Sequence, residues 1–159
     1  MAQTVTITRA NALKAYKSAD KVGKKLLTDL IPELNTPEKI TDRIKTLQDA
    51  IEAVGVSEDA HVLLAYAGKD ADMIAARSAL ELTIIARALN EDWEPDWSDS
   101  SEYKYYPWFN MSGSGVSYFD CDRVISTSAV GSRLCYKSRE LAEYAAKQFQ
   151  SHYNNFMTL

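Results

Sequence analysis

The stretch from Asp70 to Leu89, DADMIAARSALELTIIARAL, decides the fold of this chain. Asp70 is a residue type that begins helices, and most of the residues after it have small or apolar side chains. Because these side chains cover most sides of a helix, we expect the central, most buried helix of the protein here. Arg77, Glu81 and Arg87 mark the side of this helix that we expect to face water.

Three further helices are predicted before this one, over residues 9–31, 36–54 and 57–67. Each begins with a capping residue type: Thr8, Thr36 and Ser57. Pro32 ends the first, while the second has Pro37 at its first position and ends at Gly55. The second carries a narrow apolar stripe at helical spacing: Ile40, Ile44, Leu47, Ile51 and Val54. The stripe predicts a helix that seals a bundle.

The C-terminal part has a different composition, because 14 of the 16 aromatic residues lie after residue 92. Three strands are predicted there, over Tyr103–Phe109, Val116 to about Ile125, and Arg133–Lys137. Ser138 begins a last helix, whose inner stripe consists of Leu141, Ala145, Phe149, His152 and Phe156. Strand alternation places Tyr105 and Phe109 on one face of the sheet, and Tyr106 and Trp108 on the other.

These elements predict an α+β fold. An N-terminal helical bundle of about four helices leads into a small antiparallel three-stranded sheet, which packs on a C-terminal helix. The predicted regions are residues 1–91, which are helical, and residues 92–159, which are rich in aromatic side chains. At 159 residues, the two regions also fit one continuous domain.

Composition excludes several classes of protein. The formal charge is −4, and basic residues number 12 against 14 acidic ones up to residue 92, then 6 against 8. Neither half therefore has the basic surplus that non-specific DNA binding requires. No apolar run approaches the ~20 residues that span a bilayer. The first eight residues lack a charged region followed by an apolar one, so we expect no signal peptide there. We therefore expect no membrane partner.

The candidate catalytic groups are few. His61 and His152 are the only histidines, and we interpret both as structural residues. Cys135 lies between Arg133 and Lys137, which would lower its thiol pKa, but a small buried apolar residue is the preferred interpretation. Cys121 and Cys135 have no metal-binding spacing; free thiols are expected, with a cross-strand disulfide as the alternative.

Asp120 and Asp122 would share a strand face, which fits a solvated surface better than a divalent ion site. We therefore assign no catalytic, cofactor-binding or metal-binding residue, expect no cofactor, and expect a protein that is not an enzyme. The stretch from Met111 to Val130 consists largely of small and polar residues. It predicts either a displayed recognition loop or a solvated hairpin.

Aromatic and basic residues together make a candidate interaction surface. We assign seven residues to it: Trp93, Trp97, Tyr106, Trp108, Arg123, Arg133 and Lys137. Rings beside cations, with Lys104 and Tyr136 nearby, resemble the ingredients of a sheet that stacks nucleic-acid bases. Packing of the rings within the protein is the preferred interpretation, since one face of the sheet must cover the last helix.

One block of sequence consists of Tyr105-Tyr106-Pro107-Trp108-Phe109, then GSRLCYKSRELAEYA from Gly131 to Ala145, and Lys147-Gln148-Phe149. This block resembles an uncharacterised protein family of gut bacteria and their phages. Residues 88–95 also fit it. The resemblance implies a phage or mobile-element origin, and carries no catalytic residue over to this chain. It implies a location in the host cytoplasm or the virion.

Three functional hypotheses follow. The leading one is a non-enzymatic, phage- or mobile-element-related protein, either a virion-associated structural component or a protein-binding adaptor. Its partner would be a virion protein, another protein, or a second copy of this chain in an oligomer. The alternatives are a single-stranded nucleic-acid-binding module that uses Tyr106, Trp108, Arg133 and Lys137, and an acidic inhibitor of a host defence protein.

Overall fold

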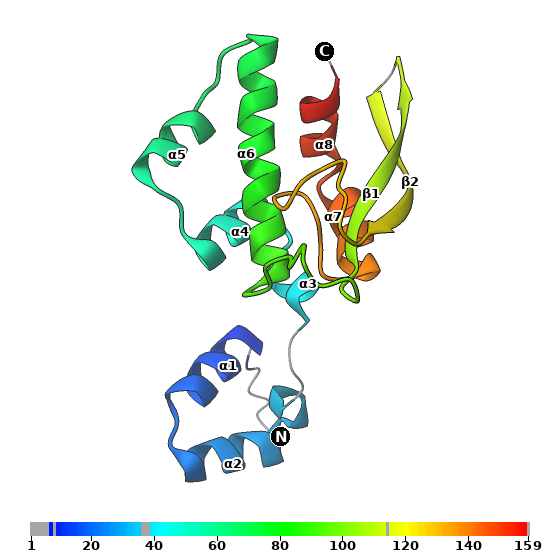
Figure 1. Cartoon of the computed structure of the whole chain (residues 1–159). Coiled ribbons are helices and arrows are strands. Elements are labelled where there is room, and N and C mark those ends of the chain that lie inside the picture. The colour runs from blue at the N-terminus through cyan, green and yellow to red at the C-terminus, as the bar shows by residue number, and fades with distance from the viewer. Residues whose placement is uncertain (1–6, 8, 36–38, 114, 159) are drawn as a thin grey trace. The chain divides into compact units, whose positions relative to one another are not determined.

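The computed structural model describes residues 7, 9–35, 39–113 and 115–158 (Figure 1). The chain divides into two units, Met1–Lys39 and Ile40–Leu159. The regular structure of the described residues consists of helices and one antiparallel hairpin, so the α+β class is confirmed. The numbers of helices and strands differ from those predicted. None of the described helices combines the length and the apolar character needed to cross a lipid bilayer.

In the first unit, the single helix predicted over residues 9–31 is two helices. These are α1 (Arg9–Ser18) and α2 (Lys21–Leu30), followed by the 3-10 helix η1 (Pro32–Asn35). Asp20 causes the break, because its Oδ1 accepts a hydrogen bond from the Gly23 backbone N at 2.8 Å and begins α2. A short acceptor side chain competes with the continuing helix at such a position. The predicted end of this region at Pro32 is confirmed.

The second unit begins with another broken helix. The predicted helix over residues 36–54 appears as α3 (Ile40–Arg43) and α4 (Leu47–Val54); Thr36, Pro37 and Glu38 lie outside the described residues. A capping box causes the break: Asp49 N donates to Thr46 Oγ1 at 3.1 Å, and Thr46 N donates to Asp49 Oδ2 at 2.8 Å. The apolar stripe nevertheless packs on the core through Ile44 and its neighbours.

The central helix is confirmed. Ser57 caps α5 (Glu58–Leu64), and Asp70 caps the 20-residue α6 (Ala71–Asn90). The large aliphatic side chains of α6 that are almost completely buried are Leu82, Ile84, Ile85 and Leu89. Glu81 was predicted to face water, and that prediction is wrong, because only 6% of the residue is exposed. Its Oε2 lies 2.7 Å from His152 Nδ1 and its Oε1 lies 3.3 Å from Arg77 Nε, so two partners offset the burial of its charge.

The predicted three-stranded sheet has two strands. β1 (Lys104–Ser112) pairs with β2 (Gly115–Val124) in an antiparallel hairpin. The expected third strand, Arg133–Lys137, is reduced to one bridge, in which Tyr105 and Tyr136 exchange two backbone hydrogen bonds of 2.9 and 2.7 Å. On the side of this segment away from β1, the side chain of Asn90 donates to Cys135 O at 2.8 Å and accepts from Lys137 N at 3.0 Å. These backbone groups are therefore not available to a neighbouring strand.

The C-terminal helix is also divided, into α7 (Arg139–Gln148) and α8 (Gln150–Met157). Ser138 caps α7 as predicted. The backbone leaves helical geometry at Phe149, with φ −114° and ψ 29°. The bend keeps the Phe149 ring in the core and directs His152 and Tyr153 of α8 towards partners on other elements.

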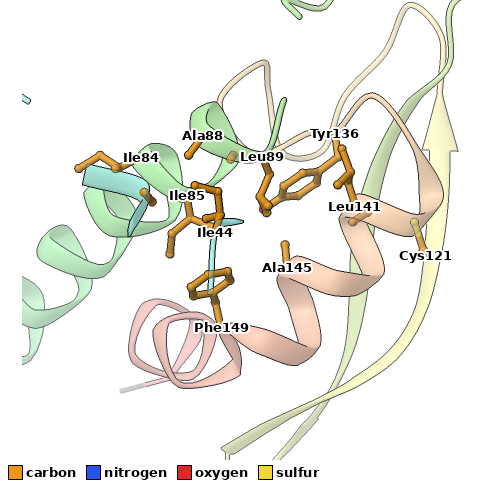
Figure 2. Close-up of a cluster of buried hydrophobic side chains, with 13 residues drawn as sticks. Ile44, Ile84, Ile85, Ala88, Leu89, Cys121, Tyr136, Leu141, Ala145 and Phe149 are labelled. Atoms are coloured by element: carbon orange, nitrogen blue, oxygen red, sulfur yellow. The ribbon is translucent and has the colours of Figure 1, made fainter. Parts of the chain in front are cut away.

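The second unit is layered. Helix α6 lies between α4 and α5 on one side and α8 on the other, and the hairpin packs on α7 and α8 (Figure 1). Figure 2 shows the core between these layers, where Leu89 of α6 lies beside Tyr136, and Phe149 lies near Ile44 and Ile85. Residues from both sides of the expected 91/92 division therefore meet in one core.

A buried phenol pair joins the segment before α7 to α8. The hydroxyls of Tyr136 and Tyr153 lie 2.9 Å apart, and both residues are buried. Burial raises the pKa of both phenols, so both stay protonated at neutral pH. Each hydroxyl is thus the hydrogen-bond partner of the other.

We expect Tyr136→Phe to lower the free energy of unfolding by about 1–2 kcal/mol, because it leaves the Tyr153 hydroxyl buried without its partner. The double variant Y136F/Y153F should lose less than the sum of the two single variants, since it removes both polar groups. Urea denaturation of the four proteins measures this coupling, with Tyr103→Phe at the exposed ring as the control. Strictly additive losses would contradict the pairing.

Candidate interaction site

The seven residues of the predicted interaction surface fall into three groups. Trp93 and Arg133 line one pocket, and Trp97 hydrogen-bonds to Ser132 of the same lining. Tyr106, Trp108 and Arg123 lie on the hairpin, whereas Lys137 is held at the end of α6. The tertiary structure therefore does not bring all seven together on one face.

The pocket lies beside the C-terminal half of α6, between the segments 93–95 and 130–133, and has a volume of about 620 Å³. We call it the Trp93–Arg133 pocket. Its lining consists of Thr83, Ala86, Arg87, Asn90, Trp93, Glu94, Pro95, Val130, Gly131, Ser132 and Arg133. A volume of this size is typical of sites that hold a small ligand or a few side chains of a partner.

A buried lysine organises the first wall of this pocket. Lys104 is completely buried at the start of β1, and its Nζ donates to the backbone carbonyls of Asp96 and, at 3.0 Å, Glu102. The same ammonium pairs with a Glu102 carboxylate oxygen at 3.0 Å and lies 5.5 Å from the Trp97 ring centroid. Lys104, considered above as part of a base-stacking surface, is therefore a structural residue inside the loop over residues 92–103.

Glu102 connects the buried ammonium of Lys104 to the pocket lining. Its two carboxylate oxygens each accept a hydrogen bond of 2.9 Å, one from Trp93 Nε1 and one from Asp96 N. Two short turns complete the loop, because Asp96 accepts from Ser98 and Asp99 accepts from Ser101. The Trp93 ring is thus fixed by its only polar atom and is partly exposed in the pocket lining.

The second wall is fastened to the first and to α6. Trp97 Nε1 donates to Ser132 Oγ at 2.7 Å, which joins the two loops directly. Ser128 Oγ accepts hydrogen bonds from Val130 N and Gly131 N, and Gly131 has a positive φ of 68° that suits glycine. Asn90 holds the following residues to the end of α6. Both walls are consequently set by the fold before any ligand arrives.

The pocket contains more positive than negative charge. Arg87 and Arg133 are both exposed in its lining, against one carboxylate from Glu94. Arg87 Nη2 donates to Gly55 O at 3.0 Å, and within the described part of the chain no hydrogen bond or ion pair engages the Arg133 guanidinium. The nearby Glu91 is neutralised by Lys137 at 3.1 Å and Arg43 at 2.5 Å, and the Lys137 hydrogen bond is the main cause of its lowered pKa.

The hairpin carries the second group of predicted residues. Phe109 faces α8, with its ring 4.7 Å from that of Tyr153, as the predicted alternation requires. On the other face Tyr106 is buried, whereas Trp108 is 49% exposed, 6.1 Å from the Tyr106 ring. Arg123 lies over the Tyr103 ring at 4.1 Å. Trp108 is therefore an exposed ring without the open aromatic platform that base stacking needs.

The stretch from Met111 to Val130 contains β2, so much of it is hairpin. A bulge between Trp108 and Phe109 leaves Phe119 without a cross-strand partner and 66% exposed. Two side chains of α8 satisfy backbone groups of Val116: Asn154 accepts from its N at 3.0 Å, and Gln150 donates to its O at 2.9 Å. This end of β2 is therefore tied to α8.

The structure also places the remaining candidates for chemistry. His152 lies beside the Glu81 carboxylate, but neither residue lines any of the three pockets described for this chain. Asp120 pairs with Arg139 at 3.1 Å, and Asp122 accepts from the Arg123 backbone. Among the described residues, no group of three or more acidic, histidine or cysteine side chains is arranged to hold a metal ion.

Sequence reasoning missed most of the pocket lining on α6 and the role of Lys104. One signal was present: in an alternating strand, Lys104 shares a face with Tyr106, so the preferred packing of the rings within the protein would cover this lysine as well. A second signal was Asn90, a polar residue directly after the most apolar helix. Ser132 gave no signal, because its role depends on the approach of Trp97 from 35 residues away.

Both cysteines should be unreactive in the folded protein. They are free and buried, and burial raises the pKa of each thiol to about 11, so activation of Cys135 by neighbouring cations is not observed. At pH 8 roughly a thousandth of each thiol is then ionised. We expect reaction with DTNB to be at least ~100-fold slower than in urea. Rapid modification of one native thiol would revive the activated-cysteine interpretation.

Acid should release the loop over residues 92–103. Hydrogen bonds from Ser98 and Ser101 lower the pKa of Asp96 and Asp99; desolvation raises that of Glu102, but hydrogen bonds from Lys104 and Trp93 outweigh it. A carboxylate whose pKa is lower in the folded than in the unfolded protein stabilises the fold when the pH is above its ordinary pKa, which is 3.8 for Asp and 4.5 for Glu. That stabilisation is lost as the pH falls through the lowered pKa of the folded protein.

In a W108F background, we expect the tryptophan emission to be constant from pH 7 to pH 5 and to shift to the red below about pH 4. Glu102→Gln should already be less stable at pH 7, because it removes the charge that faces Lys104, and it should show a smaller change in acid. Glu94→Gln in the same loop is the matched control. An identical acid transition in the Glu102 variant would rule out this ion pair as the cause.

Comparison of the chain with protein-family models, with curated proteins and with solved structures finds no match. A fold alone does not define a function, and here the geometry of the Trp93–Arg133 pocket is the evidence that bears on it.

Proposed function

We propose that this chain is a non-enzymatic protein-binding adaptor or virion-associated structural component of a phage or mobile element. It binds its partner through the Trp93–Arg133 pocket. An adaptor that captures a host defence protein would use the same site, so the inhibitor hypothesis is one form of this proposal. The phage context rests on the resemblance of residues 105–109 and 131–149 to a family of gut bacteria and their phages.

The observation that carries the proposal is a pocket whose two walls are braced to each other and to the central helix. A site that is already ordered loses less conformational entropy when it binds, and so keeps more of its contact energy as affinity. Its lining also contains an indole and two guanidinium groups. Tryptophan and arginine are the residue types that most often dominate the energy of protein interfaces.

The block of sequence that carries the resemblance supplies one of these walls. Gly131, Ser132 and Arg133 begin the second part of the block, and all three line the pocket. The first part of the block lies in β1, directly after the buried Lys104 that orders the other wall. The block thus contributes directly to one wall of this pocket.

A photo-crosslinking experiment tests the proposal. A p-benzoylphenylalanine side chain replaces Glu94 at the pocket rim, and the protein is illuminated in a lysate of cells that carry the gene, with and without phage induction. We expect one discrete protein adduct, identified by mass spectrometry. Its yield should fall at least ~10-fold in Arg133→Glu and less than ~2-fold in Arg123→Glu, because only the first reverses a charge in the lining.

The same crosslinker at the exposed Lys69 is the positional control. An adduct that forms equally from position 69, or that Arg133→Glu leaves unchanged, would argue against binding at the pocket. Capture of an oligonucleotide in place of a protein would favour the nucleic-acid alternative. Thermal unfolding of each variant confirms that a lost adduct does not reflect a lost fold.

A further inference from the structure

We infer that the Trp93–Arg133 pocket takes an acidic peptide segment of the partner, in which a carboxylate binds the arginines and a neighbouring apolar side chain packs on Trp93. The inference rests on the proposed function and names the chemistry of the ligand. It follows from the charges of the lining, from the form of its apolar surface and from its place at the end of a helix.

The charges of the lining select an anion. Arg133 is exposed and unengaged within the described part of the chain, and Arg87 uses Nη2 for Gly55 O, which leaves further N–H donors. A guanidinium presents parallel donors that match the two oxygens of a carboxylate. Glu91, the acidic residue at the adjacent helix end, is already paired with Arg43 and Lys137, so it does not compete for these arginines.

The lining therefore has a local excess of positive charge in a chain whose net charge is −4. A concave site with one dominant sign concentrates the potential and attracts the opposite charge. Glu94 is the acidic residue in the lining, and its single carboxylate does not offset the two guanidinium groups.

The apolar part of the lining favours a ligand in which an apolar side chain lies next to the carboxylate. Ala86, Pro95 and Val130 lie in the lining with Trp93, and the indole N–H is already bound to Glu102. The ring faces are then available for an aliphatic or aromatic side chain. An acidic residue next to an apolar one satisfies both halves of the pocket.

The position at the end of α6 argues against phosphate as the ligand. Anions favour the positive N-terminus of a helix, whereas this pocket adjoins the C-terminal end at Asn90, so a doubly charged group is disfavoured more than a singly charged one. The ammonium of Lys137 is occupied by Asn90 O at 3.1 Å and by Glu91. A singly charged carboxylate is therefore better matched than a doubly charged phosphoryl group.

Selection from a random octapeptide display library on the intact chain tests this inference. We expect the enriched peptides to carry Asp or Glu beside an aromatic or aliphatic residue. Replacement of that acidic residue by its amide should weaken binding at least ~10-fold, and raising the salt from 50 to 300 mM should weaken it several-fold. The chemical shift of the Trp93 indole N–H should change as the peptide is added.

Variants of the arginines locate the effect. Arg133→Glu should weaken binding of the selected peptide at least ~10-fold. Arg133→Lys should weaken it by an intermediate amount, since lysine keeps the charge but loses the parallel N–H donors of the guanidinium. Arg123→Glu should change the affinity for the peptide less than ~2-fold. Inorganic phosphate and an oligothymidylate, added as competitors at equal charge, should displace little of the peptide.

Enrichment of neutral peptides, no enrichment, or equal binding to Arg133→Glu would each overturn the acidic-peptide assignment. Efficient competition by phosphate would also overturn it. These results are distinguishable from failure of the proposed function. A protein adduct at position 94 together with selection of neutral peptides would support the adaptor function and contradict the acidic ligand. Selection of acidic peptides without any protein adduct would support a peptide-binding pocket and contradict the adaptor function.

Discussion

The buried amide of Asn90 is the interaction on which the architecture of the second unit depends. It ends the central helix α6 and holds the backbone of Cys135 and Lys137 through two hydrogen bonds. Tyr136 makes a single bridge to β1 on the other side of this segment, and Ser138 then begins α7, so the hairpin remains two-stranded. The contact of Asn90 fixes the residues that follow the pocket wall at 130–133. One buried polar side chain thus ties one wall of the candidate site to the end of α6.

A second buried polar group, Lys104, performs the matching role for the other wall. An ammonium without water is costly, and here backbone carbonyls and the Glu102 carboxylate replace its hydration. The loop over residues 92–103 folds around this charge and needs few apolar contacts of its own. Trp93 and Trp97 are consequently held at their N–H groups by Glu102 and Ser132. These rings are neither core residues nor free surface residues: Trp93 binds within its own loop, and Trp97 joins that loop to the segment 130–133.

This arrangement bears on how an acidic chain would recognise a partner. The chain carries a net charge of −4, and the two arginines of the pocket form a local positive site within it. The two walls, which are hydrogen-bonded to each other, give that site a defined form. The hairpin contributes exposed rings at Trp108 and Phe119, but with Tyr106 buried it offers no continuous stacking surface. His152 and Glu81 form a buried contact between α6 and α8, which stabilises the layers on which the pocket is built.

The sequence by itself determined the α+β class, the central position of α6, and the caps at Ser57, Asp70 and Ser138. Helical periodicity, capping and strand alternation are local properties, so a single chain segment displays them. Only the tertiary structure decided where these elements break and what the polar residues do. Thr46 and Asp20 interrupt apolar stripes that looked continuous, while Asn90, Lys104 and Ser132 act on segments distant in the chain. Their partners are chosen by packing, which no local pattern records.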